Sequence, residues 1–384
     1  MRNAPEIQIN RGRAVKNSSI KRGVMGLAAA ALIALSGAPA QAQDVIDQGG
    51  IRGAGSTFAF PIITRWSESY RRWRTNDSPF PTSNSGLEDP TATSAIDYEP
   101  IGSLAGLLRV RTGAVDFAVS DAPLDSQELT KLGLVQFPIV IGGVAIVFNL
   151  DGVGPGELWL NSKVIAGIYL GKIQNWSDPA IAAINPNLKL PNAKIAVVRR
   201  SDGSGTTYNF AHYLAKDSPE WRERLGVDTT LSWPAITAGA RGNEGVAQTV
   251  RQTKNSIGYV EFSYAVKAKL GYAAIENSTG VFIRPEPKNF QAAAIRADWK
   301  TEKDFNQMLT NAPGNDSYPI AATAFVLMPK QPTSPRRARE VLNFLQWSLD
   351  SGAKDAETLG YVPLPEPLIK QVKEYWRSTL KAGS

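Results

Sequence analysis

Short apolar runs alternate with helical patterns along most of the chain, and several of these runs end in turns of glycine and hydroxyl residues. The clearest case is the run Ile195–Val198, which leads through two arginines into a glycine-rich turn at 201–205. Apolar positions spaced four apart then predict a helix from Thr206 through Leu214. The sequence therefore predicts a strand, a tight turn and a helix in direct succession.

Three other stretches repeat this pattern earlier in the chain. Each is a short predicted strand followed by a turn that presents a hydroxyl or carboxyl side chain, namely Thr57, Ser103 and Asp121. The alternation of strands and helices predicts an α/β protein. Ligand sites in such sheets lie at the carboxyl ends of the strands, so we expect these residues to converge with the 200–206 loop on one cleft.

Two longer apolar runs predict buried strands that connect two domains. The run Phe137–Phe148 is continuous and could pass from one domain to the other, and the run Thr323–Met328 could carry the chain back. Two amphipathic helices are then predicted to close the chain, one around Leu345 and one around Val372.

Residues 75–97 interrupt the pattern. This stretch is rich in serine, threonine, proline, asparagine and aspartate and has no hydrophobic periodicity. It predicts a long surface loop. Because it follows the C-terminal end of its helix, we expect it on the side away from the cleft.

The 200–206 loop has the chemistry of an oxyanion site. The first N–H groups of a helix lack intrahelical partners, and the helix dipole adds positive potential there. Gly203 and Gly205 allow close approach of the backbone, and Arg200, Ser204 and Thr206 supply side-chain donors. The alternative is an ordinary capped turn. ATP and GTP are disfavoured, because Thr206 stands where a nucleotide-binding loop has its lysine.

The composition excludes several other chemistries. The chain has 384 residues, enough for two ordinary domains, and no cysteine, which excludes disulfides, thiol catalysis and a lipid anchor on cysteine. Its one histidine, His212, lies on a predicted helix among apolar residues. We interpret it as a packed side chain rather than a base, and sites with several histidine ligands are impossible.

The first 42 residues are typical of a secretory signal peptide. A basic region precedes an apolar segment, and small residues allow cleavage after Ala42. A membrane anchor is the alternative, although the apolar segment is short for a bilayer. These residues include six basic and one acidic side chain, so their removal lowers the formal charge from +7 to +2. A mature chain this close to neutral gives no indication of nucleic-acid binding.

Several blocks resemble one known family, the periplasmic phosphate-binding proteins of high-affinity phosphate ABC transporters (the Pst system). The resemblance covers essentially all of residues 51–380, and it rests on ordered blocks. They are Gly53–Phe58, Val115–Leu124, Gln136–Gly143, Tyr169–Ile173 with Asn175 and Trp176, Ala196–Thr206 and Ile257–Glu261.

The resemblance implies the fold class, a two-domain α/β periplasmic binding protein with a ligand cleft between hinged domains and two crossing strands. We expect domain I at 43–140 and 319–384, domain II at 141–318, and the hinge near Val140 and Pro319. It also implies the residues that hold phosphate. They are Thr57, Phe58 (through its backbone), Ser103, Asp121, Arg200, Ser204, Gly205 (through its backbone) and Thr206, with Asp202 paired to Arg200.

One departure from the family concerns the turn after Ser103. The family's turn usually continues with small serine or glycine residues, whereas Leu104 and Ala105 stand here. The local backbone contacts of this turn are therefore expected to differ.

Asp121 is expected to select a protonated anion. Phosphate near neutral pH carries at least one proton, from which a buried carboxylate can accept a hydrogen bond, whereas sulfate offers only lone pairs. Arsenate, which is protonated like phosphate, is not excluded. The alternative is that Asp121 only caps a helix or turn ahead of Pro123. In that case the site would bind any tetrahedral oxyanion.

Taken with the resemblance, these residues predict a periplasmic protein without a lipid anchor that captures inorganic phosphate. It would deliver phosphate to the membrane permease subunits of an ABC transporter, as a monomer, without catalysis, cofactor, metal or nucleic acid. One alternative is a secreted phosphatase or phosphotransferase, which would need a nucleophile, a general base and usually metals. The other is a receptor for a different oxyanion, such as sulfate or molybdate.

Overall fold

The computed structural model describes residues 50–76 and 96–380. The predicted signal peptide (1–42) lies outside these residues, and so does most of the predicted 75–97 loop. Within the two described ranges, no helix is long and apolar enough to cross a membrane.

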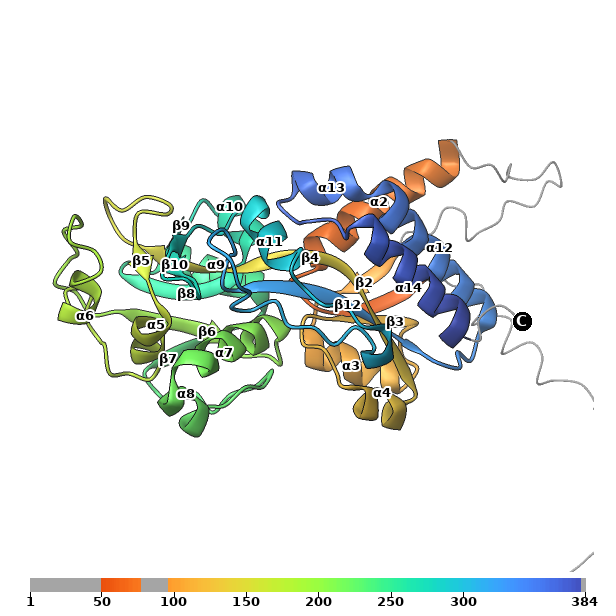
Figure 1. Ribbon diagram of the computed structural model, residues 1–384, viewed down its shortest axis with the longest axis horizontal. Helices are drawn as coiled ribbons and strands as arrows, with labels where there is room; N and C mark the ends of the chain where they lie inside the picture. The colour runs from red at the N-terminus through yellow and green to blue at the C-terminus, as the bar shows by residue number, and fades with distance from the viewer. Residues whose placement is uncertain (1–49, 77–95, 381–384) are drawn as a thin grey trace, which may run out of the picture. The chain divides into compact units, whose positions relative to one another are not determined.

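Twelve strands form two sheets within the described residues. The strands are β1 (Arg52–Gly55), β2 (Asp97–Glu99), β3 (Phe117–Ser120), β4 (Leu134–Asn149), β5 (Trp159–Leu160), β6 (Ala196–Arg200), β7 (Thr237–Ala240), β8 (Ser256–Glu261), β9 (Gly271–Tyr272), β10 (Ala274–Glu276), β11 (Phe282–Ile283) and β12 (Ala321–Pro329). The larger sheet has the order β2-β1-β3-β12-β4-β8-β6-β7, with β9 also paired to β4 (Figure 1). The smaller sheet has the order β11-β10-β5.

Strands β4 and β12 join the two halves of the larger sheet. The first part of β4, Leu134–Gly143, pairs antiparallel with β12, and the remainder, Val144–Asn149, pairs with β8. Strand β12 in turn pairs with β3. Both strands are buried along nearly their whole length, as their continuous apolar sequences predict. The two predicted crossing strands are therefore confirmed.

Helices pack against both halves of this sheet (Figure 1). On the side of domain I lie α2 (Phe60–Asn76), α3 (Ser103–Arg111), α4 (Ser126–Leu132), α12 (Pro335–Ser351), α13 (Ala353–Thr358) and α14 (Glu366–Thr379). On the side of domain II lie α5 (Ser162–Tyr169), α6 (Pro179–Ala182), α7 (Gly205–Asp217), α8 (Pro219–Arg224), α9 (Gly242–Gln252), α10 (Phe262–Lys267) and α11 (Pro287–Ala294). The 3-10 helix η1 (Thr301–Lys303) contacts α14 instead. The domain boundaries at 140/141 and 318/319 stay a prediction, and the names domain I and domain II are kept for these halves.

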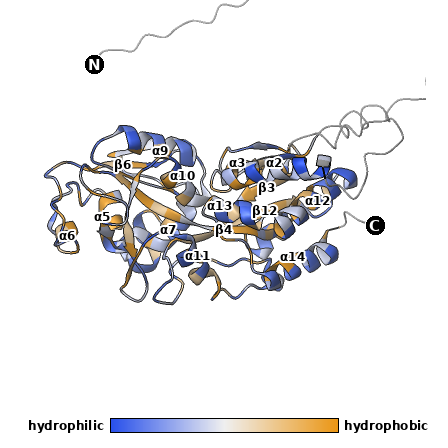
Figure 2. Ribbon diagram, turned by 90° about the horizontal axis from the view of Figure 1, so that it is seen from above, coloured by the Kyte–Doolittle hydropathy of each residue, from blue (hydrophilic) through white to orange (hydrophobic). Residues whose placement is uncertain are grey.

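The two closing helices follow the predicted amphipathic pattern. On α14, Leu368, Val372 and Trp376 are spaced four apart and all are buried, while Lys370 is exposed. In Figure 2, α12 and α14 alternate between apolar and polar colours. The sequence analysis missed only the short helix α13 between them.

A glycine contact holds α3 against the sheet. A Cβ atom on Gly106 of α3 would lie 2.4 Å from Cα of Gly55 and 2.8 Å from the carbonyl oxygen of Ala54, both in β1. Backbone atoms inside a sheet cannot move aside for a methyl group. The absence of a side chain at Gly106 therefore sets how closely α3, which begins at Ser103, approaches β1.

We predict that Gly106→Ala lowers the free energy of unfolding by about 1–3 kcal/mol, the usual cost of overpacking. Urea denaturation of the ligand-free protein measures this change. Gly245→Ala in helix α9 is the matched control, because the nearest atom to its added Cβ is the carbonyl carbon of Ala240, at 3.7 Å. It should leave stability unchanged or raise it by up to about 1 kcal/mol. Equal midpoints for wild type and Gly106→Ala would show that the contact does not constrain α3.

Candidate functional site

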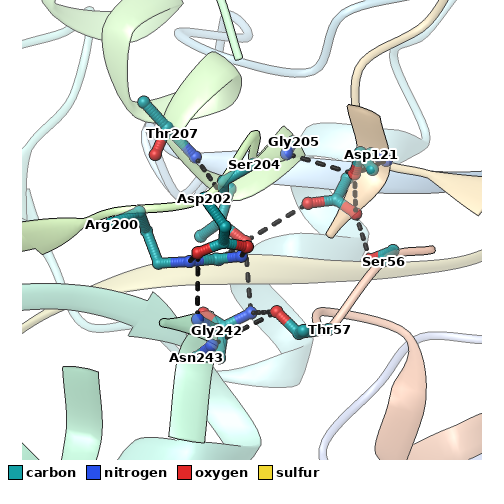
Figure 3. Close-up of polar contacts among 12 residues, drawn as sticks. Ser56, Thr57, Asp121, Arg200, Asp202, Ser204, Gly205, Thr207, Gly242 and Asn243 are labelled. Carbon is teal, nitrogen blue, oxygen red and sulfur yellow. Dashed lines mark hydrogen bonds and ion pairs between the residues drawn. The ribbon is translucent and has the colours of Figure 1, made fainter. Parts of the chain in front are cut away.

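Four helices begin around one buried cluster of polar side chains. Helices α2 and α3 of domain I contribute the turn 56–58 and Ser103. Helices α7 and α9 of domain II contribute the turn 204–206 and the pair 242–243. Hydrogen bonds tie these turns together across the two domains (Figure 3). Since each helix presents its N-terminal N–H groups, the cluster has the positive backbone environment that favours an anion.

Arg200 lies at the end of β6 and is held in one orientation by Asp202. Its Nε donates to Asp202 Oδ1 at 2.8 Å and its Nη2 to Oδ2 at 2.5 Å. The N–H of Gly242 donates to the same Oδ1 at 3.0 Å. Burial alone would raise the pKa of Asp202, but the hydrogen bonds and charge of Arg200, helped by Gly242, lower it. The predicted pairing of these two residues is therefore present in the structure.

The third nitrogen of the Arg200 guanidinium points into the cluster. Its Nη1 donates to the hydroxyl of Thr206 at 3.3 Å. The neighbouring Ser204 caps helix α7, because its Oγ accepts the N–H of Thr207 at 3.1 Å. Ser204 thus fixes where the helix starts, and with it the positions of Gly205 and Thr206.

Asp121 follows β3 and is fully buried. Its Oδ1 accepts hydrogen bonds from the hydroxyls of Ser56 and, at 3.4 Å, of Ser103, and its Oδ2 accepts from the hydroxyl of Thr206 at 3.2 Å. Burial raises the pKa of Asp121 to about 6, although these hydrogen bonds and the charge of Arg200 oppose the shift.

The helix that follows Asp121 is capped by a different residue. Asp125 accepts the N–H of Glu128 at 2.8 Å and is the N-cap of α4. The alternative interpretation of Asp121 as a helix cap is therefore wrong, and its carboxylate faces the cluster instead.

Gly205 brings α7 of domain II against domain I. Its N–H donates to Ser103 Oγ at 3.1 Å, and an added Cβ would lie 2.6 Å from Cγ of Asp121. Nearby, the Leu104 N–H donates to the Gly203 carbonyl at 3.2 Å. Leu104, where the sequence departs from the family, thus makes a backbone contact across the cleft, and Ser103 keeps its place beside Asp121.

Thr57 and Phe58 lie in the turn before α2. The Thr57 hydroxyl accepts two hydrogen bonds from Asn243, and the hydroxyl of Tyr264 donates to the Thr57 carbonyl at 2.7 Å. The carbonyl of Phe58 accepts from Tyr361 at 2.6 Å, and its ring is buried in the core. Among the described residues, no acceptor is bonded to the N–H of Phe58.

Asn243 is a member of the cluster that the sequence analysis missed. It is fully buried at the second position of α9, and its amide contacts Thr57 of domain I and Thr206 of domain II. A sequence signal for it exists, because a fifth strand ends at Ala240 and is followed within three residues by a glycine and an asparagine. Asn209 was missed too, and its side chain donates to the Asp121 carbonyl at 2.5 Å.

Glu261 is a second buried carboxyl, at the end of β8. Its Oε2 accepts from the N–H of Ser263 at 3.0 Å and from the same residue's hydroxyl, while its Oε1 has no partner among the described residues. Burial raises the pKa of Glu261 to about 8, against the effect of the bonds from Ser263. The nearby charge of Asp121 adds to the rise. Glu261 is therefore largely protonated at neutral pH.

His212 is packed as predicted. Its Nδ1 lies 2.6 Å from the hydroxyl of Thr310. Burial, together with the charge of Lys216, lowers the pKa of His212 to about 4, so the ring is neutral. Among residues 50–76 and 96–380, no group of three or more histidine, aspartate or glutamate side chains could hold a metal ion.

The structure brings most of the predicted residues into one hydrogen-bonded cluster. Thr57, Ser103, Asp121, Arg200, Gly205 and Thr206 are joined through direct bonds or through Asn243. Phe58 and Ser204 lie beside the cluster, because their chain neighbours Thr57 and Gly205 belong to it. Their roles toward a ligand stay a prediction.

Comparisons with known proteins identify what this chain is similar to. A family model described as the PBP superfamily domain matches residues 36–351. A protein of Xylella fastidiosa named phosphate-binding protein PstS is 46% identical over 331 residues, which cover 86% of each chain. One of the same name from Haemophilus influenzae is 40% identical over 331 residues, covering 86% of this chain and 93% of the relative.

A solved structure with a similar fold agrees with these sequence matches. The crystal structure of a phosphate binding protein from Stenotrophomonas maltophilia superposes with a TM-score of 0.62 at 20% identity. The match covers 85% of this chain and 93% of that one. At this identity the likeness shows the fold alone. The predicted two-domain α/β fold class is confirmed.

We predict that Glu261→Gln changes how stability depends on pH. In the wild type, the folded protein keeps the Glu261 proton up to about pH 8, whereas the unfolded chain loses it near an ordinary glutamate pKa. Stability therefore falls as pH rises through this window, by at most about 1.4 kcal/mol per pH unit. The variant lacks this loss, so it should gain stability relative to wild type between about pH 5 and pH 8.

Urea denaturation of ligand-free protein at each pH measures the difference. Glu244→Gln is the control for net charge, because Glu244 is exposed on α9. A constant difference between Glu261→Gln and wild type across the window would contradict the raised pKa of Glu261.

Proposed function

The chain belongs to the PBP superfamily and, within it, to the PstS-type phosphate-binding proteins, and on this premise we propose that it captures inorganic phosphate for import by an ABC transporter. Phosphate is bound in the cluster between the two domains. The proposed ligand residues are those predicted from the sequence. They are Thr57, Phe58, Ser103, Asp121, Arg200, Ser204, Gly205 and Thr206.

The arrangement of one carboxylate among many donors carries this proposal. Four helix N-termini, Arg200 and several hydroxyls can all donate to an anion. Within this cluster, Asp121 provides a carboxylate that can accept a hydrogen bond from a protonated ligand. A dehydrated anion that also carries a proton satisfies both features, and phosphate is such an anion near neutral pH. Sulfate would leave the Asp121 charge buried and repelled, at a cost on the order of several kcal/mol.

Binding is coupled to the closure of two domains. Donors from domain II, such as Gly205 and Asn243, bond directly to acceptors in domain I. The domains are joined by β4 and β12, so closure is a rotation about these strands near Val140 and Pro319. Phosphate, which would contact both domains, shifts the equilibrium toward the closed form.

The protein acts in the periplasm and passes phosphate to membrane permease subunits. The predicted signal peptide at 1–42, cleaved after Ala42 and followed by no cysteine, supports export without a lipid anchor. The similarity to PstS proteins supports a permease partner. We further propose that the protein is a monomer when it binds phosphate.

A phosphatase or phosphotransferase is not favoured by the cluster. Such an enzyme needs a nucleophile activated by a base. The hydroxyl of Thr206 donates to Asp121, but the same carboxylate already accepts from Ser56 and Ser103. His212, the one histidine, is bonded to Thr310 instead. The family consists of binding proteins, so the protein is proposed to bind without turnover.

Isothermal titration of protein freed of carried-over ligand should show one phosphate site per chain and no heat from sulfate at the same concentration. Arsenate should compete with phosphate, because it carries a proton at the same pH. Turnover of a chromogenic phosphomonoester should be absent. Saturable sulfate binding with no phosphate binding would contradict the proposal.

Asp121→Asn should reduce the preference for phosphate over sulfate by about a hundredfold or more, because an amide can donate to sulfate and removes the repelling charge. Competition binding measures the ratio. Wild type should show the same trend as pH falls from 8 to 5, since Asp121 becomes protonated through its pKa of about 6. Asp125→Asn, at the exposed cap of α4, is the control and should leave the ratio unchanged. An unchanged ratio in Asp121→Asn would remove Asp121 from the explanation of selectivity.

A further inference from the structure

The orientation of the Asn243 amide is fixed by its backbone partner. The Glu261 N–H lies 2.9 Å from Oδ1 of Asn243, and a backbone N–H can only donate. The oxygen must therefore face Glu261, and the NH2 group must face the cluster. The amide nitrogen can then only donate to the hydroxyls around it.

This amide determines what the Thr57 hydroxyl can do. The Thr57 oxygen accepts from the Asn243 backbone N–H at 3.2 Å and from Nδ2 at 2.9 Å. A hydroxyl has two lone pairs and one hydrogen, so both of its acceptor positions are used. Among the described residues, no acceptor takes the hydrogen of this hydroxyl. Its hydrogen is thus left to donate toward a ligand.

Thr206 is constrained in the same way from the other domain. Its oxygen accepts from Nδ2 of Asn243 at 3.2 Å and from Nη1 of Arg200 at 3.3 Å. With both lone pairs occupied, its hydrogen must donate, and in this structure it donates to Asp121 Oδ2. Asn243 therefore makes both threonines donors, while Asp121 stays an acceptor.

We propose that Asn243 is a positioning residue that sets the Thr57 hydroxyl as a donor to a phosphate oxygen and holds the Thr206 hydroxyl as the donor to Asp121. It acts through Thr57 and Thr206. The inference rests on the proposed function, because it assumes that the ligand between the domains is phosphate. It also accounts for the burial of an asparagine that contacts both domains and the end of β8.

A double-mutant cycle in phosphate affinity tests this role. Asn243→Ala should weaken phosphate binding about tenfold or more, because the Thr57 hydroxyl is then free to turn away. Thr57→Val removes the hydroxyl at similar volume. In the Thr57→Val background, Asn243→Ala should cost markedly less than in wild type, and the remaining loss should arise through Thr206. A purely structural asparagine would cost the same in both backgrounds.

Asn243→Asp provides a second variant of nearly the same shape. It puts an acceptor where Nδ2 stood, so it should weaken phosphate binding even more than Asn243→Ala while the circular dichroism spectrum stays native. Asn289→Ala is the matched control, because this buried asparagine of α11 bonds to the Arg284 carbonyl away from the cluster. It should lower the unfolding midpoint and leave phosphate affinity unchanged.

The outcomes separate the two proposals. If wild type does not bind phosphate, the proposed function fails. If wild type binds phosphate and either folded Asn243 variant binds it within twofold of wild type, the positioning role fails. Equal losses from Asn243→Ala in the wild-type and Thr57→Val backgrounds would also overturn it. If Asn243→Ala does not fold, the phosphate affinity of Asn243→Asp decides whether the positioning role holds.

Discussion

A fully buried carboxyl has to be surrounded by hydrogen-bond donors, and the site is organised around that requirement at Asp121. Its two oxygens accept from hydroxyls of both domains, Ser56 and Ser103 on one side and Thr206 on the other. Without such donors, a buried carboxylate costs several kcal/mol. The bonds to Asp121 therefore stabilise the closed arrangement as well as the charge. Under the proposed function, the same residue would stabilise closure and reject an unprotonated anion.

The sheet explains why the donors arrive from both sides. Strands β1 and β3 run parallel in domain I, and β6 and β7 run parallel in domain II. Each of these strands ends at the cleft, and the four helices that begin beside it contribute N–H groups. The antiparallel pair β4 and β12 runs between the halves, so the two sets of strand ends face one another. A single cluster of donors therefore results from chain topology.

Much of this could be predicted from local sequence, since strand ends, glycine turns and hydroxyls follow one another within a few residues. The crossing strands were predictable because they are apolar throughout, whereas the pairing of Arg200 with Asp202 was implied by the family resemblance. Asn243 could not be predicted in this way, because its contacts to Thr57 and Thr206 span 186 and 37 residues and depend on how the domains meet. Glu261 was noted only as part of a family block. Its unpaired carboxyl oxygen results from burial, which no local sequence pattern predicts.

Asn243 also links the ligand site to the strands that join the domains. Its Oδ1 holds the N–H of Glu261, and Glu261 pairs with Val144 on β4, next to the point where β4 changes partner. Any rotation about β4 and β12 that separates Thr57 from Thr206 must break at least one of the Asn243 bonds, because the amide is fixed on domain II. Under the proposed function, the donor pattern that phosphate requires is complete only when the domains are closed. The same hydrogen bonds would then serve both recognition of the anion and closure.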